Sequence, residues 1–120
     1  MKYLKTYEKK IQLNPQVGDY VICNEDEEEY KSSYNTPDIL YSDNLCTNFI
    51  NSNIGKCIFI NTNVGGAYYY IQYENIPTEI KDYFKMLHEN TRRMMRNEII
   101  YFSSNKEDLE PYINAIKYNI

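Results

Sequence analysis

Three short runs of β-branched and aromatic residues, each bounded by Gly, Asn or Pro, constrain the fold of this chain most. They cover residues 17–23, 53–60 and 68–77. Runs of this composition favour β-strands, and turn residues at these spacings connect antiparallel neighbours. The sequence therefore predicts a small, strongly bent antiparallel β structure.

The second and third runs are expected to pair as a β-hairpin over residues 55–61 and 67–75. Gly65 and Gly66 lie between them and supply the positive φ angles that tight hairpin turns need. Alternation along the second strand puts two sets of side chains on opposite faces: Ala67, Tyr69, Ile71 and Tyr73 toward the core, and Tyr68, Tyr70, Gln72 and Glu74 outward.

Two further strands and two helices are expected from local pattern. The strands are residues 20–23 and 97–102. Helical spacing of apolar residues predicts an amphipathic helix over residues 78–88. A shorter helix, capped by Asp43 or Asn44, is expected to end at residues 51–53.

A capped helix is expected at the C-terminus. Ser104 and Glu107 have the S-x-x-E spacing of a capping box, and Leu109, Tyr112, Ile113 and Ile116 follow on one helical face. Pro111 falls in the first turns, so the helix should start irregularly.

The length of 120 residues predicts one domain, over residues 17–120, after an N-terminal arm or short helix at 1–16. A polar stretch at 24–43, which contains the acidic run of residues 25–29, is expected to be one long loop. Loops of this length inside a compact domain are uncommon and tend to be functional or disordered.

Composition predicts an intracellular protein without a cofactor. No apolar run approaches the roughly 20 residues needed to cross a bilayer, and the N-terminus lacks the apolar core of a signal peptide. Cys23, Cys46 and Cys57 are odd in number and have no C-x-x-C spacing, so we expect buried thiols rather than disulfides or a metal site. The net charge of −4 disfavours extensive phosphate binding.

Tyr68 and Tyr70 are the leading binding candidates because both are expected on the outward face of the hairpin. Tyrosine offers a broad contact area at low entropic cost and is enriched in interfaces. The chain has 14 tyrosines, so a structural or self-association role stays open for this pair beside a ligand-binding role.

The basic candidates are Arg92, Arg93 and Arg96, with Lys85 upstream. If this stretch is helical, Arg92 and Arg96 stand one turn apart and could contact phosphates or an acidic neighbour. A solvated basic turn is the alternative.

The acidic candidates are Glu27 and Glu28, which could bind a basic partner or belong to a mobile, solvated loop. Consecutive carboxylates do not follow the spacing of calcium loops. His88, the single histidine, could act as a general base beside Cys46 or Cys57, but the sequence provides no such pairing. We therefore expect no enzymatic activity.

Four motifs combine turn glycines, core aliphatic residues and a helix cap. They are Val17-Gly18-Asp19-Tyr20-Val21, Phe49-Ile50-x-x-x-Ile54-Gly55-Lys56, Tyr70-Ile71-x-Tyr73-Glu74-Asn75-Ile76-Pro77 and Ile99-Ile100-Tyr101-Phe102-Ser103. Over residues 17–120 the chain resembles a family of short proteins of large A/T-rich DNA viruses and phages. The resemblance implies an α+β, mainly β fold: a small SH3-like antiparallel barrel with a short inserted helix and a capped C-terminal helix. The family has no settled activity, so the resemblance assigns no functional residue.

The first strand and the Ile54-Gly55-Lys56 turn are also similar to KOW-type and Tudor-type barrels, which bind RNA, ribosomes or modified tails. Two departures are the acidic loop, placed where such modules present their ligand site, and the lack of a compact aromatic cage.

Together these features predict a non-catalytic accessory protein that binds a protein partner, in the host-cell cytoplasm or in the virion, with homo-oligomer formation as a further possibility. One alternative is a KOW-like nucleic-acid or ribosome binder that uses Lys56, Lys85 and the three arginines. Another is an acidic decoy that inhibits a host defence protein.

Overall fold

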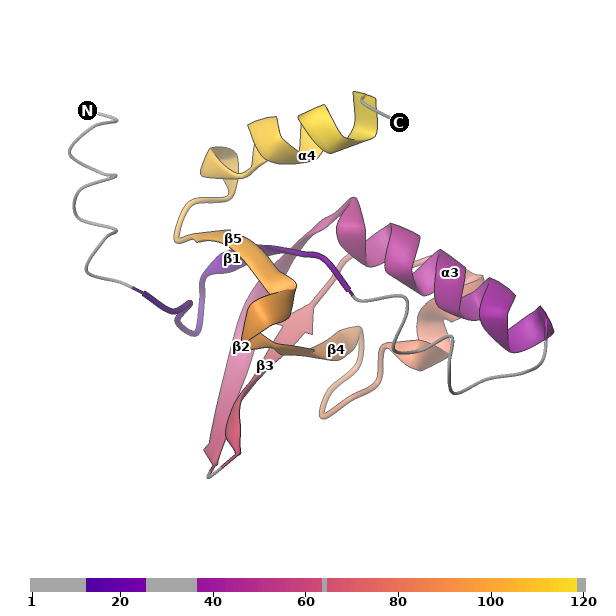
Figure 1. The fold of residues 1–120 in the computed structure, drawn as a ribbon, viewed down its shortest axis with the longest axis horizontal. Helices are drawn as coiled ribbons and strands as arrows, with labels where there is room; N and C mark the ends of the chain where they lie inside the picture. Colours follow the sequence, from indigo (N-terminus) through magenta and orange to yellow (C-terminus); the bar gives the residue numbers. More distant parts are fainter. Residues whose placement is uncertain (1–12, 26–36, 64, 119–120) are drawn as a thin grey trace.

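The structure, a computed structural model, describes residues 13–25, 37–63 and 65–118. They form an α+β fold, mostly β, in which a five-stranded antiparallel sheet carries a few helices (Figure 1). The strands are β1 (Tyr20–Cys23), β2 (Ile54–Asn63), β3 (Gly66–Gln72), β4 (Thr91–Met95) and β5 (Ile99–Ser103). The α-helices are α3 (Pro37–Asn51) and α4 (Glu110–Tyr118), and short 3₁₀ helices are η1 (Thr78–Tyr83), η2 (Arg96–Glu98) and η3 (Lys106–Asp108).

The predicted hairpin is confirmed as β2 and β3, which extend away from both α-helices (Figure 1). The two strands pair from Lys56 and Gln72 out to Asn63 and Gly66, and Gly66 closes the turn with a φ of 132°. A bulge between Cys57 and Phe59 shifts the register. Such bulges increase the local twist of a sheet, so this hairpin is bent as expected.

The sheet must curl because its two edge strands are joined by only three residues. The strand order is β4-β3-β2-β1-β5, so β4 and β5 are opposite edges. A flat sheet would hold them about 19 Å apart. The link through η2 spans at most about 14 Å from Met95 to Ile99. Among the described residues β4 and β5 do not pair, so the sheet is open, and closure into a barrel stays a prediction.

One face of the sheet holds the main core, under α3 and η1. Tyr69, Ile71 and Tyr73 point into it, which confirms the predicted alternation on β3. Phe49 of α3 meets the rings of Tyr73 and Phe84 edge-on, with centroids 5.7 and 5.6 Å away. Edge-to-face aromatic contacts add stability beyond the area that they bury.

The opposite face of β1 holds a smaller cluster, in which Ile22 packs against Leu109 and Ile113 of the C-terminal segment. The predicted helix is present, but it begins after the 3₁₀ turn of η3, as the position of Pro111 led us to expect. The turn is fixed by Ser103, whose hydroxyl donates to Asp108 Oδ2 at 2.7 Å and accepts from the Asn105 N–H at 3.1 Å. The N-cap residue of η3, Asn105, makes no side-chain cap hydrogen bond, so Ser103 and Asp108 hold this turn in place of the predicted capping box of Ser104 and Glu107.

Several predicted elements are wrong. The stretch at 24–43 is not loop throughout, because α3 begins at Pro37, a residue that suits a first helical turn. Residues 78–88 form a 3₁₀ helix only to Tyr83 rather than an amphipathic α-helix. The stretch with the three arginines is not helical: residues 91–95 are strand β4, and β5 begins at Ile99 rather than at residue 97. Most of the predicted arm or short helix at 1–16, namely residues 1–12, and the carboxylates Glu27 and Glu28 lie outside the described residues.

The three cysteines are free and buried, which confirms the prediction for them. Burial raises the pKa of the Cys23 thiol to about 12, an effect that the neighbouring Tyr73 hydroxyl opposes. Burial also raises the pKa of Cys57 to about 11 and that of Tyr73 well above its ordinary value. All three groups are therefore neutral at physiological pH.

We expect the free energy of unfolding to fall as the pH rises from about 9 toward 12. The unfolded chain loses the thiol protons near pH 9.0, whereas the folded chain keeps that of Cys23 up to about 12. Deprotonation therefore favours the unfolded state across this interval. Urea unfolding at pH values of about 8 and 10.5, in reductant, measures the slope. Cys23→Ala should flatten it, and an unchanged slope in that variant would contradict the assignment.

Candidate functional site

The outward side chains of β2, β3 and β4 gather near the tip of the hairpin. Register places Tyr70 between Phe59 on β2 and Arg93 on β4, and it places Tyr68 opposite Met95. We call this set the outer aromatic face: Phe59, Tyr68, Tyr70, Arg93 and Met95. Phe59 is 44% exposed and Met95 50% exposed, while the two tyrosines are partly exposed.

Contacts between these side chains order the outer aromatic face. The guanidinium carbon of Arg93 lies 4.7 Å from the centre of the Tyr68 ring, within the range of a cation–π interaction. The rings of Phe59 and Tyr70 lie 5.7 Å apart with a tilt of 47°. The sequence identified both tyrosines and Arg93, but not Phe59 or Met95, whose places depend on the bulge in β2 and on the unpredicted strand β4.

A hollow of about 270 Å³ adjoins this face between the hairpin tip and η2. Tyr68 and Met95 form part of its wall, together with Gly66 and Asn97. Hollows beside exposed aromatic side chains accept anchoring side chains in protein interfaces. The face is therefore not flat at this end.

Arg92 lies on the other side of β4, in the core, with 7% exposure. Its Nε donates to Glu25 Oε2 at 2.8 Å, and its guanidinium lies over the Phe84 ring at 5.6 Å. Thr47 of α3 donates its hydroxyl to the other oxygen of Glu25 at 3.2 Å. Arg92 and Glu25 therefore join β4, α3 and the end of β1, and Arg92 is not a surface contact in this structure.

Arg96 points in a third direction and holds the segment before β1. Its guanidinium donates to the Leu13 carbonyl, to Asn14 Oδ1 and to the Ile99 carbonyl, each at 3.0 Å. The guanidinium carbon of Arg96 lies 5.4 Å from the centre of the Phe102 ring. The three arginines are thus dispersed, and the structure does not gather them into one basic patch.

Lys85 forms an exposed ion pair with Asp82 at 3.0 Å. His88 is exposed on the loop that follows, whereas Cys46 and Cys57 are buried in the core. The raised pKa of Cys57 keeps its thiol protonated. His88 therefore has no accessible thiol from which it could remove a proton to form a nucleophilic thiolate.

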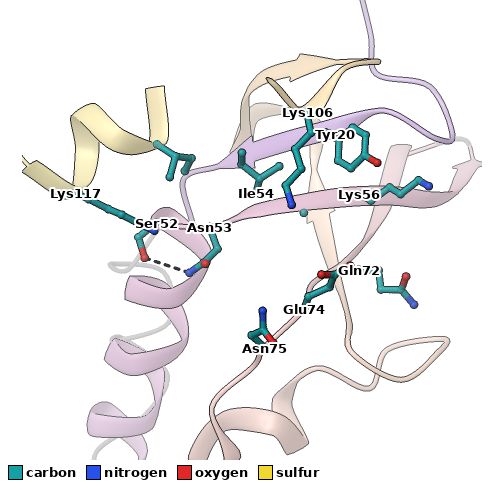
Figure 2. Close-up of a pocket in the computed structure, with 12 residues that line it drawn as sticks. Tyr20, Ser52, Asn53, Ile54, Lys56, Gln72, Glu74, Asn75, Lys106 and Lys117 are labelled. Atoms are coloured by element: carbon teal, nitrogen blue, oxygen red, sulfur yellow. Dashed lines mark hydrogen bonds between the residues drawn. The ribbon is translucent and has the colours of Figure 1, made fainter. Parts of the chain in front are cut away.

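A larger hollow, of about 380 Å³, lies between the start of β2, the end of β3 and the C-terminal segment (Figure 2). We call it the lysine pocket because Lys56, Lys106 and Lys117 all line it, along with one acidic side chain, Glu74. Of these lysines only Lys56 is a candidate from the sequence, because no local pattern indicates that lysines so far apart in the chain line one pocket.

No group of three or more His, Cys, Asp or Glu side chains within the described ranges could hold a metal ion. In the same part of the chain, no helix is long and apolar enough to cross a membrane.

Comparison with known proteins gives no assignment: no family model matches the chain, and neither a curated protein nor a solved structure is significantly similar to it.

Proposed function

We propose that this protein is a non-catalytic module that binds a protein partner through the outer aromatic face. The observation that carries the proposal is a set of Tyr, Phe, Met and Arg side chains that remain partly or largely exposed on one side of the sheet, beside a hairpin that extends away from both α-helices (Figure 1). These residue types are enriched in the centres of protein interfaces. The stack of Arg93 on Tyr68 holds two of them in place before binding, which lowers the entropic cost of association.

The partner binds the face of the sheet rather than adding a strand beside β4, the edge strand next to the outer aromatic face. Edge strand β4 is partly closed, because the Thr91 N–H donates to the Phe84 carbonyl at 2.9 Å and the Thr91 carbonyl accepts from the Met86 N–H at 3.0 Å. The Met95 N–H donates to Glu98 Oε1 at 2.8 Å. Strand addition needs a row of open backbone groups, and β4 offers little of one.

The proposal includes an SH3-like barrel of a viral or phage accessory protein, acting in the host-cell cytoplasm or in the virion. The barrel alone is supported by the meander β1 to β4, the return of β5 to β1 and the short link through η2 that makes the sheet curl. The nucleic-acid alternative loses support because the arginines are dispersed. The decoy alternative rests on the acidic run at residues 25–29, of which Glu25 is buried in an ion pair with Arg92 and the others, Glu27 and Glu28 included, lie outside the described residues.

The test is the double substitution Tyr68→Ala with Tyr70→Ala. We expect it to weaken partner binding at least about 30-fold, the effect of losing one or two interface hot spots, without lowering the melting temperature by more than a few degrees. The partner is first identified by crosslinking in host extract, and its affinity is then measured for each variant by titration with purified partner.

Tyr101→Ala with Tyr112→Ala is a matched control. These two tyrosines stack at 4.3 Å and are 42% and 47% exposed, on β5 and α4 rather than on the outer aromatic face. Binding that survives loss of Tyr68 and Tyr70 but not of the control pair would overturn the proposal. Binding to RNA or DNA that falls steeply with salt and ignores all four tyrosines would favour the KOW-like alternative.

A further inference from the structure

The lysine pocket combines a suitable volume with a concentration of positive charge. Its volume of about 380 Å³ lies in the range of small-molecule sites. Three lysines line it in a chain whose net charge is −4. Among the described residues Glu74 is the single acidic side chain in its wall, which leaves two of the three lysine charges uncompensated there.

The lysines come from separate elements that the fold brings together. Lys56 lies on β2, Lys106 on η3 and Lys117 near the end of α4. Figure 2 shows Lys117 reaching toward Ser52 and Lys106 reaching toward β2, with Glu74 and Asn75 on the opposite side. No one of the three lysines forms an ion pair within the described residues. No described carboxylate therefore neutralises their charge through a direct ion pair.

The rest of the pocket wall combines polar side chains with two isoleucines, Ile54 and Ile113, and an aromatic ring. Amide side chains of Gln72 and Asn75 lie in it, and both can donate hydrogen bonds. The Tyr20 ring also lines the pocket, and Lys56 Nζ sits 5.7 Å from its centre. An anion with a planar organic group would find both charge and an aromatic surface here.

We propose that the lysine pocket binds a small phosphate monoester of about the size of a mononucleotide. A phosphate monoester carries nearly two negative charges at neutral pH, which matches the two uncompensated positive charges. Lysine binds phosphate as a point charge and needs no fixed bidentate geometry, so lysines from different elements can contribute to one anion site. This site is separate from the outer aromatic face and does not depend on its function.

Titration of the ¹⁵N-labelled protein with AMP, followed by amide chemical shifts, tests the proposal. We expect shifts at Lys56, Glu74 and Lys106 that saturate at millimolar AMP or below. Lys106→Gln with Lys117→Gln should weaken the affinity about tenfold or more, because two of three charges are lost. Adenosine, which lacks the phosphate, should bind much more weakly than AMP.

Lys81→Gln is the matched control, since Lys81 is an exposed lysine on η1 and does not line the pocket. Three results would overturn the proposal: no saturating shifts with millimolar AMP, equal binding of adenosine and AMP, or equal weakening by Lys81→Gln and by the pocket substitutions. The substituted lysines are exposed, and unchanged melting temperatures of the variants would exclude misfolding as a cause.

Discussion

Replacing Arg92 by Leu is expected to reduce the free energy of unfolding by about 3–5 kcal/mol. Arg92 and Glu25 form an ion pair of 2.8 Å, with side chains 8% and 2% exposed. Without Arg92, the Glu25 carboxylate loses its counter-charge in a site that water does not reach, and leaving a charge buried without a partner is strongly destabilising. Chemical denaturation of Arg92→Leu and the parent measures the difference.

Arg93→Leu is the natural control, because it makes the same chemical change one residue along β4 on the exposed face. It should alter stability by no more than about 0.5 kcal/mol. The double variant Glu25→Leu with Arg92→Leu should recover much of the loss, since removing both charges of a buried pair is far less harmful than removing one. A loss below about 1 kcal/mol for Arg92→Leu would mean that the pair is not buried as described.

Sequence reasoning succeeded where alternation and turn chemistry agree. Strand β1 was predicted with its observed bounds, and the core and outward sets of β3 were assigned correctly around Gly66. Both predictions depend on local pattern alone. The register between β2 and β3, including the bulge in β2, depends on how the two strands pair in the folded protein. The sequence alone therefore does not place Phe59 beside Tyr70.

Strand β4 was missed because a charged residue occupies an inward position. Arg92 points to the core and Arg93 to solvent, so the strand reads as a basic cluster rather than as an alternating apolar pattern. The same holds for Glu25, which begins an acidic run that is typical of a solvated loop but is itself buried. Charged residues usually indicate exposed positions, but Arg92 and Glu25 are buried because they pair with each other. The two residues lie 67 positions apart in the sequence, so no local pattern indicates the pair.

The lysine pocket illustrates a second limit. Lys56 and Lys106 are fifty positions apart, and their meeting depends on how the C-terminal segment packs against Ile22 and Ile54. No local periodicity encodes that packing. The outer aromatic face could therefore be predicted in part from the sequence, whereas the lysine pocket is visible only in the fold.

Gly55→Ala should destabilise the protein by at least about 3 kcal/mol, the upper end of the usual range for overpacking, and Gly55→Val by more. The sequence attributed a role to Gly55 as a turn residue, but Gly55 lies inside β2, opposite Val21. A Cβ atom there would lie 2.3 Å from Ile71 Cγ2 and 2.9 Å from Tyr73 Cε1. Both neighbours are fully packed in the core, so neither can retreat without disturbing other contacts.

The other two hairpin glycines separate this steric effect from backbone strain. Gly66 has a φ of 132° but open space around it, so Gly66→Ala should cost about 1–2 kcal/mol through strain alone. Gly65 is exposed, its nearest Cβ contact would be at 3.5 Å, and Gly65→Ala should be close to neutral. Urea unfolding of the three alanine variants should therefore show by far the largest loss of unfolding free energy for Gly55→Ala, a smaller loss for Gly66→Ala and almost none for Gly65→Ala. Equal losses at Gly55 and Gly66 would instead support a turn at both positions, and the close approach of β2 to Ile71 and Tyr73 would then be wrong.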